Sequence, residues 1–335
     1  MARFGLAVWS HHIRDFGGRD EIERHAQRLA DAGYDILIPC VKNPTGAADF
    51  LTDLADVNPA YPGWDPLKVL IESCQAKGVK VHPWFCVFTE GEQSKLLREQ
   101  PGLRASIEGN VARTWACACR DEVQDYAFSL YRDLALRYRP DGLHLDYIRT
   151  GGPCRCEFCT EQMKGKGVDI TAVDFKDPAS ELWTEWRASR ITGFVKRLHQ
   201  FTSDRRMELS AAVFAGYPDS IRGQGQDWLQ WAELGIVDYL FPMNYTNSLR
   251  VARTRTICHV ALIGGRTPVW EGLGKASSAS QLSTEALRDQ VKGVIAAGAA
   301  GVVLFHYGAV TSEDERAIRL LREGGARTSR PRSKR

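Results

Sequence analysis

The sequence predicts a single (β/α)8 barrel, on the strength of three observations. Short apolar runs alternate with amphipathic, helix-type patterns along the chain, which is typical of βαβ units in a parallel sheet. Eight such runs occur in 335 residues, a length that suits one barrel with insertions. The first run is followed by SHHIRDFGG, which lacks the G-x-G-x-x-G turn that usually follows the first strand of a doubly wound sheet.

The first half of the chain is expected to hold four strands separated by helices. The strand patterns cover residues 4–10, 34–41, 79–88 and 141–148, and the helical patterns cover 19–33, 65–78 and 120–140. The helix over 65–78 has the clearest boundaries, because Asp65 suits the N-cap, Pro66 the first turn and Gly78 the end.

The second half continues the alternation. Helices are expected over 181–201, 226–235 and 284–298, followed by a closing helix, and strands over 207–217, 237–245, 267–273 and 300–308. Asp227 with Gln230, and Ser312 with Glu315, have the spacing of capping boxes. We expect one barrel domain over residues 1–325. The basic segment 326–335, ARTSRPRSKR, lacks large apolar side chains and is expected to be a disordered tail.

Composition and charge exclude several classes of function. The net charge is only +3 and acids and bases are interspersed, so nothing favours nucleic-acid binding. No apolar run reaches the roughly 18–20 residues of a membrane span. The N-terminal apolar run is too short for a secretory signal. We therefore expect a cytoplasmic protein, or an exported one if the sequence is a mature or trimmed form. The oligomeric state stays open.

Two connections are long, 89–120 after the third strand and 149–180 after the fourth. In a barrel both lie on the face formed by the carboxyl ends of the strands, where active sites of this fold are found. Residues that end the expected strands are rich in aromatic, carboxylate and amide groups. That mixture suits sugars, whose apolar faces stack on rings. The candidate substrate-binding residues are Trp9, His82, Trp84, His144, Tyr147, Arg149, Asp219, Asn244, Tyr245, Trp270, His306 and Tyr307.

Glycoside hydrolysis generally needs two carboxyl groups flanking one bond. Asp146 and Glu271 end the fourth and seventh strands, across the barrel mouth from each other, and are the predicted catalytic pair. Asp219 and Glu90 are the reserve candidates. Structural interpretations remain open: Asp146 could cap its loop or pair with an arginine, Glu271 could pair with a buried arginine, and the histidines within strands could be packed interior residues.

Two segments resemble a known family. They are RDEVQDYAFSLYRDLALRYRPDGLHLDYIR and QDWLQWAELGIVDYLFPMNYT, together about 50 residues. They are similar to the family-10-like glycosyl hydrolases of bacteria, which are predicted (β/α)8 barrels. The resemblance implies that Asp146 is the acid of the fourth strand and that Asn244 and Tyr245 line the wall at the sixth.

A weaker similarity is to chitinase-type barrels, which carry a DxxDxDxE motif on the fourth strand. Asp141 and Asp146 match the first and third acids, whereas His144 replaces the middle aspartate and Ile148 stands where the proton-donating glutamate would be. This departure argues against substrate-assisted catalysis with the usual acid.

Nine cysteines are present, so at least one thiol is free unless chains pair. Cys40, Cys74, Cys86 and Cys258 fit apolar patterns and are expected in the core. The candidate metal ligands are Cys154, Cys156 and Cys159, with Cys117 or Cys119 as a fourth, in a structural zinc site. Disulfides and free thiols are the alternatives.

The sequence therefore predicts a glycoside hydrolase that acts on an oligo- or polysaccharide and needs no cofactor for catalysis. A non-catalytic carbohydrate-binding barrel is the second hypothesis, motivated by the missing glutamate. A metal-dependent barrel enzyme of another class is the third.

Overall fold

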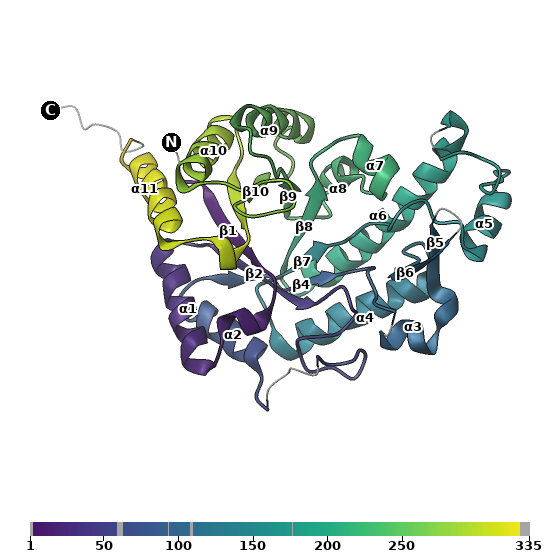
Figure 1. Ribbon diagram of the computed structural model, residues 1–335, viewed down its shortest axis with the longest axis horizontal. Helices are drawn as coiled ribbons and strands as arrows, with labels where there is room; N and C mark the ends of the chain where they lie inside the picture. Colours follow the sequence, from purple (N-terminus) through teal and green to yellow (C-terminus); the bar gives the residue numbers. More distant parts are fainter. Residues whose placement is uncertain (1–2, 59–62, 93, 108–109, 176, 329–335) are drawn as a thin grey trace.

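The computed structural model describes residues 3–58, 63–92, 94–107, 110–175 and 177–328. Its centre is a closed parallel barrel, which confirms the predicted fold (Figure 1). The strands follow the order of the chain, and β1 pairs with both β2 and β11 to close the barrel. The strands are β1 Gly5–Ser10, β2 Ile36–Lys42, β3 Lys80–Val81, β4 Trp84–Cys86, β7 Gly142–Asp146, β8 Glu208–Phe214, β9 Tyr239–Met243, β10 Trp270–Gly274 and β11 Gly301–Phe305.

Segments β3 and β4 are two halves of the one strand predicted over 79–88. Both pair with β2, and the sequence between them is His82–Pro83. Because a proline has no amide hydrogen, Pro83 cannot donate to a strand ladder, and the regular pairing stops there. The carbonyl of Pro83 still accepts from His144 N at 3.0 Å, so the chain stays in register with β7.

Helices cover the outside of the barrel (Figure 1). Asp65 caps α2 by accepting from Lys68 N, as predicted. Asp227 caps α8 in the same way. The closing helix is capped by Thr311 and Asp314 rather than by the predicted Ser312 and Glu315. The longer helices are α1 Arg19–Ala32, α2 Pro66–Gln75, α4 Asp121–Tyr138, α6 Glu181–Ser203, α9 Leu249–Ile263, α10 Thr284–Ala296 and α11 Ser312–Thr328.

Three features were not predicted. Helix α9 follows β9, where the sequence analysis placed no element. The loop after β4 contains α3 Lys95–Glu99 and a hairpin of β5 Arg104–Ile107 with β6 Asn110–Ala116, and the loop after β7 contains α5 Glu157–Lys164. The short helix α7 Asp219–Gln224 lies between β8 and α8 Trp228–Glu233, and only α8 was predicted, over 226–235. Helix α11 runs to Thr328, three residues into the predicted tail, and 329–335 lie outside the described residues.

The barrel interior is filled by large side chains, so it is a packed core and not a pore. Trp9, Trp84, Phe241 and Trp270 belong to one buried cluster inside the ring of strands. At Gly272 a Cβ atom would lie 3.0 Å from the Trp9 ring, so glycine at this position leaves room for the indole. No helix in the described ranges combines the length and the apolar character needed to span a membrane.

The four cysteines that were expected in the core divide between the interior and the surface. Cys40, Cys74 and Cys86 are buried, as predicted. The prediction for Cys258 is wrong, because this residue lies on α9 and is exposed. Its neighbours in sequence, Ile257 and His259, face solvent and the interior respectively, so the apolar pattern around it does not mark one buried face.

Candidate functional site

Asp146 is the last residue of β7, at the carboxyl-end face of the barrel. The residue is partly exposed, and its Oδ1 accepts from Tyr147 N at 2.6 Å. Burial raises the pKa of Asp146 to about 6, against the opposing effects of the Tyr147 amide and the Arg149 charge. Raised carboxyl pKa values are typical of general acids, which must keep a proton near neutral pH.

The backbone turns sharply beyond this carboxyl group. Tyr147 has φ of +49°, in the left-handed region that costs free energy for a residue with a Cβ. The turn carries the Tyr147 ring to 6.1 Å from the ring of Trp115, on β6. Such backbone strain at a strand end is common where side chains are positioned for function.

Arg149 lies in a cage of rings next to Asp146. Its guanidinium stands 4.8 Å from the Tyr147 ring centroid, 4.8 Å from Phe214 and 5.5 Å from Trp115. Trp115 and Phe214 were absent from the sequence prediction. Phe214 ends β8, so it could have been predicted as a residue at a strand end. Trp115 lies on a hairpin inside a loop, and its place at the mouth could not be predicted from the strand pattern.

The opposite wall of the mouth also consists of rings. The ring centroid of Tyr245 lies 5.2 Å from that of Phe305, and the ring centroid of His11 lies 4.3 Å from that of His306. Burial lowers the pKa of His11, and the nearby His306 lowers it further. Burial likewise lowers the pKa of His306. Both histidines are therefore neutral near pH 7 and can donate or accept hydrogen bonds. Of the predicted substrate-binding residues, Tyr147, Arg149, Tyr245 and His306 are partly exposed in this region.

Five other predicted substrate contacts form the interior of the barrel. His144 Nε2 accepts from Trp9 Nε1 at 3.0 Å, and its Nδ1 lies 2.8 Å from Ser210 Oγ. Burial holds the pKa of His144 well below its usual value, so the ring is neutral. His82 is bound to Ser210 and Glu208. The buried residues of this set, whose prediction as sugar contacts the structure corrects, are Trp9, His82, Trp84, His144 and Trp270.

Glu271 is not at the barrel mouth. Because neighbouring side chains on a strand point to opposite faces, Trp270 enters the barrel and Glu271 points out, toward α9. There its carboxylate is fully buried, 2.8 Å from His259 Nδ1 and 3.0 Å from Asn244 Nδ2. Burial opposes protonation of His259, but the contact with Glu271 outweighs it and raises the pKa of His259. The structure thus does not bring Glu271 together with Asp146.

Three further predicted residues lie away from the mouth. Asn244 is buried and donates to Ala252 O as well as to Glu271. Tyr307 is buried, with its hydroxyl 2.7 Å from His25 Nδ1 and its ring stacked on Phe16. Asp219 is exposed at the first residue of α7, beside a separate cavity lined also by Arg222 and Asp227.

We expect the Glu271→Gln variant to lose stability and to keep activity. The change removes a charged partner of His259, which costs about 1.5–3 kcal/mol of the free energy of unfolding. Urea unfolding measures the stability, and initial rates on any accepted substrate measure the activity. His259→Gln is the matched control and should show a similar loss of stability. A Glu271→Gln protein of normal stability that has lost turnover would return this residue to the catalytic site.

Glu90, the other reserve acid, is also withdrawn from solvent. Its Oε1 lies 2.7 Å from Lys42 Nζ, and both side chains are 1% exposed. Lys42 also donates to the carbonyls of Cys86 and Thr89. This ion pair therefore ties the end of β2 to the beginning of the loop after β4.

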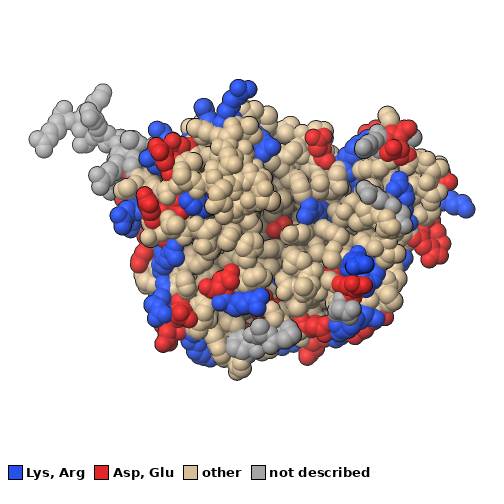
Figure 2. All heavy atoms as spheres, viewed as in Figure 1, with Lys and Arg blue, Asp and Glu red and all other residues tan. Residues whose placement is uncertain are grey.

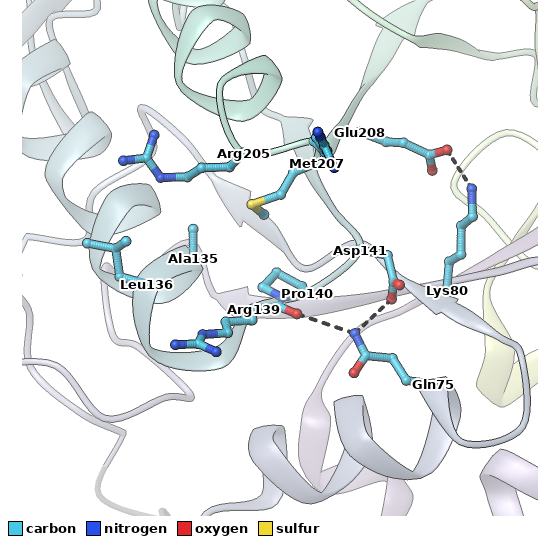
Figure 3. A pocket seen from close by; sticks show the side chains of 11 residues that line it. Gln75, Lys80, Ala135, Leu136, Arg139, Pro140, Asp141, Arg205, Met207 and Glu208 are labelled. Atoms are coloured by element: carbon cyan, nitrogen blue, oxygen red, sulfur yellow. Dashed lines mark hydrogen bonds and ion pairs between the residues drawn. The ribbon is translucent and has the colours of Figure 1, made fainter.

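A cavity of about 580 Å³ opens at the other end of the barrel (Figure 3). Gln75 bridges Arg139 O and Asp141 there, and Lys80 pairs with Glu208. Lys80 and Glu208 begin strands, so this cavity lies at the amino ends of the strands, where residues of this fold serve stability. We place the candidate site at Asp146 instead. The face in Figure 2 carries most of its charges around the edge, and near its centre a small acidic patch and a basic patch lie among uncharged residues.

Comparison with known proteins places this (β/α)8 barrel in the class of glycosyl hydrolase-like proteins. The family model described as "Glycosyl hydrolase-like 10" matches residues 15–259, well over half of the chain. The chain belongs to this family, which confirms the resemblance seen in its sequence.

Curated proteins similar in sequence to this chain are also described as glycosyl hydrolases. Glycosyl hydrolase DigH of Escherichia coli strain K12 is 29% identical over 215 residues, and DigH of strain CFT073 is 23% identical over 220 residues. Each match covers 55% of this chain and 47% of the relative, so the chain spans about half the length of the curated relatives that it matches.

Solved structures share the fold. The PgaB (BpsB) glycoside hydrolase domain of Bordetella bronchiseptica superposes with a TM-score of 0.73 at 18% identity, covering 94% of this chain and 98% of that domain. The catalytic domain of a Paenibacillus polymyxa beta-amylase gives 0.66 at 9% identity, covering 98% and 99%. At such identities the likeness establishes the barrel and not the chemistry.

Proposed function

We propose that this protein is a glycoside hydrolase in which Asp146 is the general acid. The observation that carries the proposal is Asp146, a partly exposed residue among rings at the barrel mouth, whose carboxyl pKa is raised by burial to about 6. A protonated carboxyl group can donate its hydrogen to the departing glycosidic oxygen as the bond to the sugar carbon breaks. Membership of the glycosyl hydrolase-like family supports the same reaction class.

The surrounding groups suit a sugar. Tyr147 and Trp115 offer ring faces for the apolar side of a pyranose, and His306 offers a neutral ring nitrogen for a hydroxyl group. Arg149 has a second role in this proposal. Its charge favours the ionised form of Asp146, so it stabilises the carboxylate that remains after proton transfer.

Glu271 is not the second catalytic carboxylate in this proposed function. Its burial between His259 and Asn244 leaves Glu271 without access to a bound sugar, so the group that attacks the sugar carbon is a water molecule or a substrate atom rather than this carboxylate. The same observation favours a second candidate function, a barrel that binds carbohydrate without cleaving it. The two functions make opposite predictions for turnover.

The first test is the pH dependence of hydrolysis. Purified protein is incubated with a panel of oligo- and polysaccharides, and new reducing ends are measured. Because Asp146 must be protonated to act as the acid, kcat/KM should fall as pH rises through about 6. A rate that instead rises through this range would refute the role of Asp146 as the acid. Sugar binding by calorimetry with no reducing ends released would establish the binding-only barrel.

A further inference from the structure

Five buried cysteines lie together at one side of the barrel, where the two long loops meet. Cys117 and Cys119 follow β6, and Cys154, Cys156 and Cys159 lie in the loop after β7 and at the start of α5. Figure 1 shows β5, β6 and α5 close together there, beside one end of α6. The ligand atoms of Cys117, Cys154, Cys156 and Cys159 all lie within 4.8 Å of one another.

The spacing of these sulfur atoms fits one metal ion. The Sγ atom of Cys159 lies 3.5 Å from that of Cys117 and 3.7 Å from that of Cys156. Four sulfurs at about 2.3 Å from a tetrahedral zinc ion are about 3.8 Å apart from one another. The cluster is thus of the size that a single ion needs, and no bond joins any two of these sulfurs, since all four cysteines are free thiols.

Hydrogen bonding around the cluster suits thiolates. Ser106 N on β5 points at the Cys154 sulfur at 3.3 Å. Backbone amides directed at sulfur are the outer-shell contacts that orient metal ligands. Ile107 and Cys154 also form an antiparallel bridge, so the backbone holds one ligand in place before any ion binds.

A buried cation next to the cluster is the independent observation. Arg187 is 0% exposed, and its terminal nitrogens donate to Thr150, to Gly152 O and to Arg222 O, all of them uncharged acceptors. Its Nε is buried without a hydrogen-bond partner among the described residues. Its guanidinium lies 5.8 Å from the ring centroid of Trp183, which belongs to the same buried cluster as the cysteines. A buried charge needs a counter-charge, and neutral thiols do not supply one.

We propose that Cys117, Cys154, Cys156 and Cys159 bind one Zn²⁺ ion in a closed, structural site. The four thiols release their protons to solvent on binding, so Zn²⁺ with four thiolates carries a net charge of −2. Arg187 offsets part of that charge. Four protein sulfurs leave no open position for water, so the ion does not take part in catalysis. Cys119 is buried beside the cluster without being a ligand, which decides between the two residues that the sequence left open.

The site fastens the β5–β6 hairpin to the loop after β7. Trp115 precedes Cys117 by two residues, and Gly151, three residues before Cys154, lies against the Trp115 indole, where a Cβ would come within 2.5 Å. Trp115 in turn faces Tyr147 and Arg149. The ion would therefore hold one wall of the barrel mouth in place. This last step rests on the proposed function, whereas the metal site itself does not.

The experiment is to measure zinc in the 335-residue protein by mass spectrometry of the metal, after purification without chelators. We expect one zinc ion per chain in the wild type and in Cys119→Ser, and a loss of at least tenfold in zinc content in Cys117→Ser. Cys258→Ser, at an exposed cysteine remote from the cluster in sequence, is a second control and should keep its zinc.

Wild-type protein provides a measurement that does not depend on the folding of a variant. Replacing the ion with Co²⁺ should give the thiolate-to-cobalt charge-transfer absorption of a tetrahedral four-sulfur site. Iron in place of zinc, no bound metal, disulfides found by mass under non-reducing conditions, or zinc retained by Cys117→Ser and lost by Cys119→Ser would each overturn the assignment. Because metal content is measured without substrate, its outcome is independent of whether the protein hydrolyses sugars.

Discussion

Replacing Asp146 by asparagine is expected to lower kcat by about 10²–10⁴, the usual contribution of a general acid. Asparagine keeps the shape of the side chain, and its Oδ1 can still accept from Tyr147 N, so the turn at this strand end should survive. What is lost is the proton for the leaving group. The rates are to be measured on the best substrate of the panel, together with substrate affinity, which should change little.

The same substitution should stabilise the fold above neutral pH. The folded state holds the Asp146 proton to about pH 6, whereas an unfolded aspartate loses it near about pH 4. A raised pKa means that the folded state binds the proton more tightly, so stability falls as pH rises from about 4 to about 6. The asparagine side chain has no charge to bury, and removing a difference of about two pKa units gains up to about 3 kcal/mol at pH 8.

Lower turnover combined with higher stability is a signature that a structural aspartate would not give. A carboxylate that merely capped the loop would leave the variant less stable, since its hydrogen bond would be weakened. The matched control is Asp219→Asn, at an exposed aspartate that begins α7, for which neither property should change. An Asp146→Asn protein that turned over substrate normally would remove the general acid from the proposal.

Strand periodicity was sufficient to locate Asp146 but not Glu271. Both residues were expected at strand ends, and the eight-strand alternation was predictable because each strand is a compact apolar run between helices. The seventh strand was expected over 267–273, whereas β10 is Trp270–Gly274, so Glu271 lies near the beginning of the strand. Its side chain points outward because that of Trp270 points into the barrel. The helix that covers it, α9, has the sequence LRVARTRTICHVALI, in which arginines and threonines interrupt any apolar stripe. Without α9, His259 had no visible partner and Glu271 appeared exposed.

Contacts between loops were beyond the reach of sequence reasoning for a different reason. The sequence marked 89–120 and 149–180 as long loops on the functional face, but periodicity says nothing about which loop residues meet. The Trp115 ring can lie beside Tyr147 and Arg149 because Gly151, from the other loop, leaves room for it. The short spacing of Cys154, Cys156 and Cys159 was visible, whereas the choice of Cys117 over Cys119 needed coordinates.

Among the described ion pairs, the one between Lys42 and Glu90 is expected to have the largest effect on stability. Lys42→Met leaves the Glu90 carboxylate buried without its counter-charge, which typically costs about 3–5 kcal/mol of the free energy of unfolding. Urea unfolding at pH 7 measures this loss. The double variant Lys42→Met, Glu90→Met replaces both charges by apolar groups of similar size and should recover most of it. If the single and double variants were equally unstable, the lost contacts would be those of Lys42 with Cys86 O and Thr89 O rather than the ion pair.

The Lys42→Met substitution should also affect the barrel mouth, because the loop held by the Lys42–Glu90 ion pair carries Trp115. Thr89 forms an antiparallel bridge with Trp115, and Glu90 N donates to Thr114 O at 3.0 Å. Loosening Glu90 therefore loosens the strand that presents the Trp115 ring beside Arg149. We expect a weaker substrate affinity in folded Lys42→Met protein, with KM rising more than kcat falls, because in the proposed function the Trp115 ring binds the sugar and Asp146 is untouched. A fall in kcat at constant KM would instead mean that the ion pair acts on the acid itself.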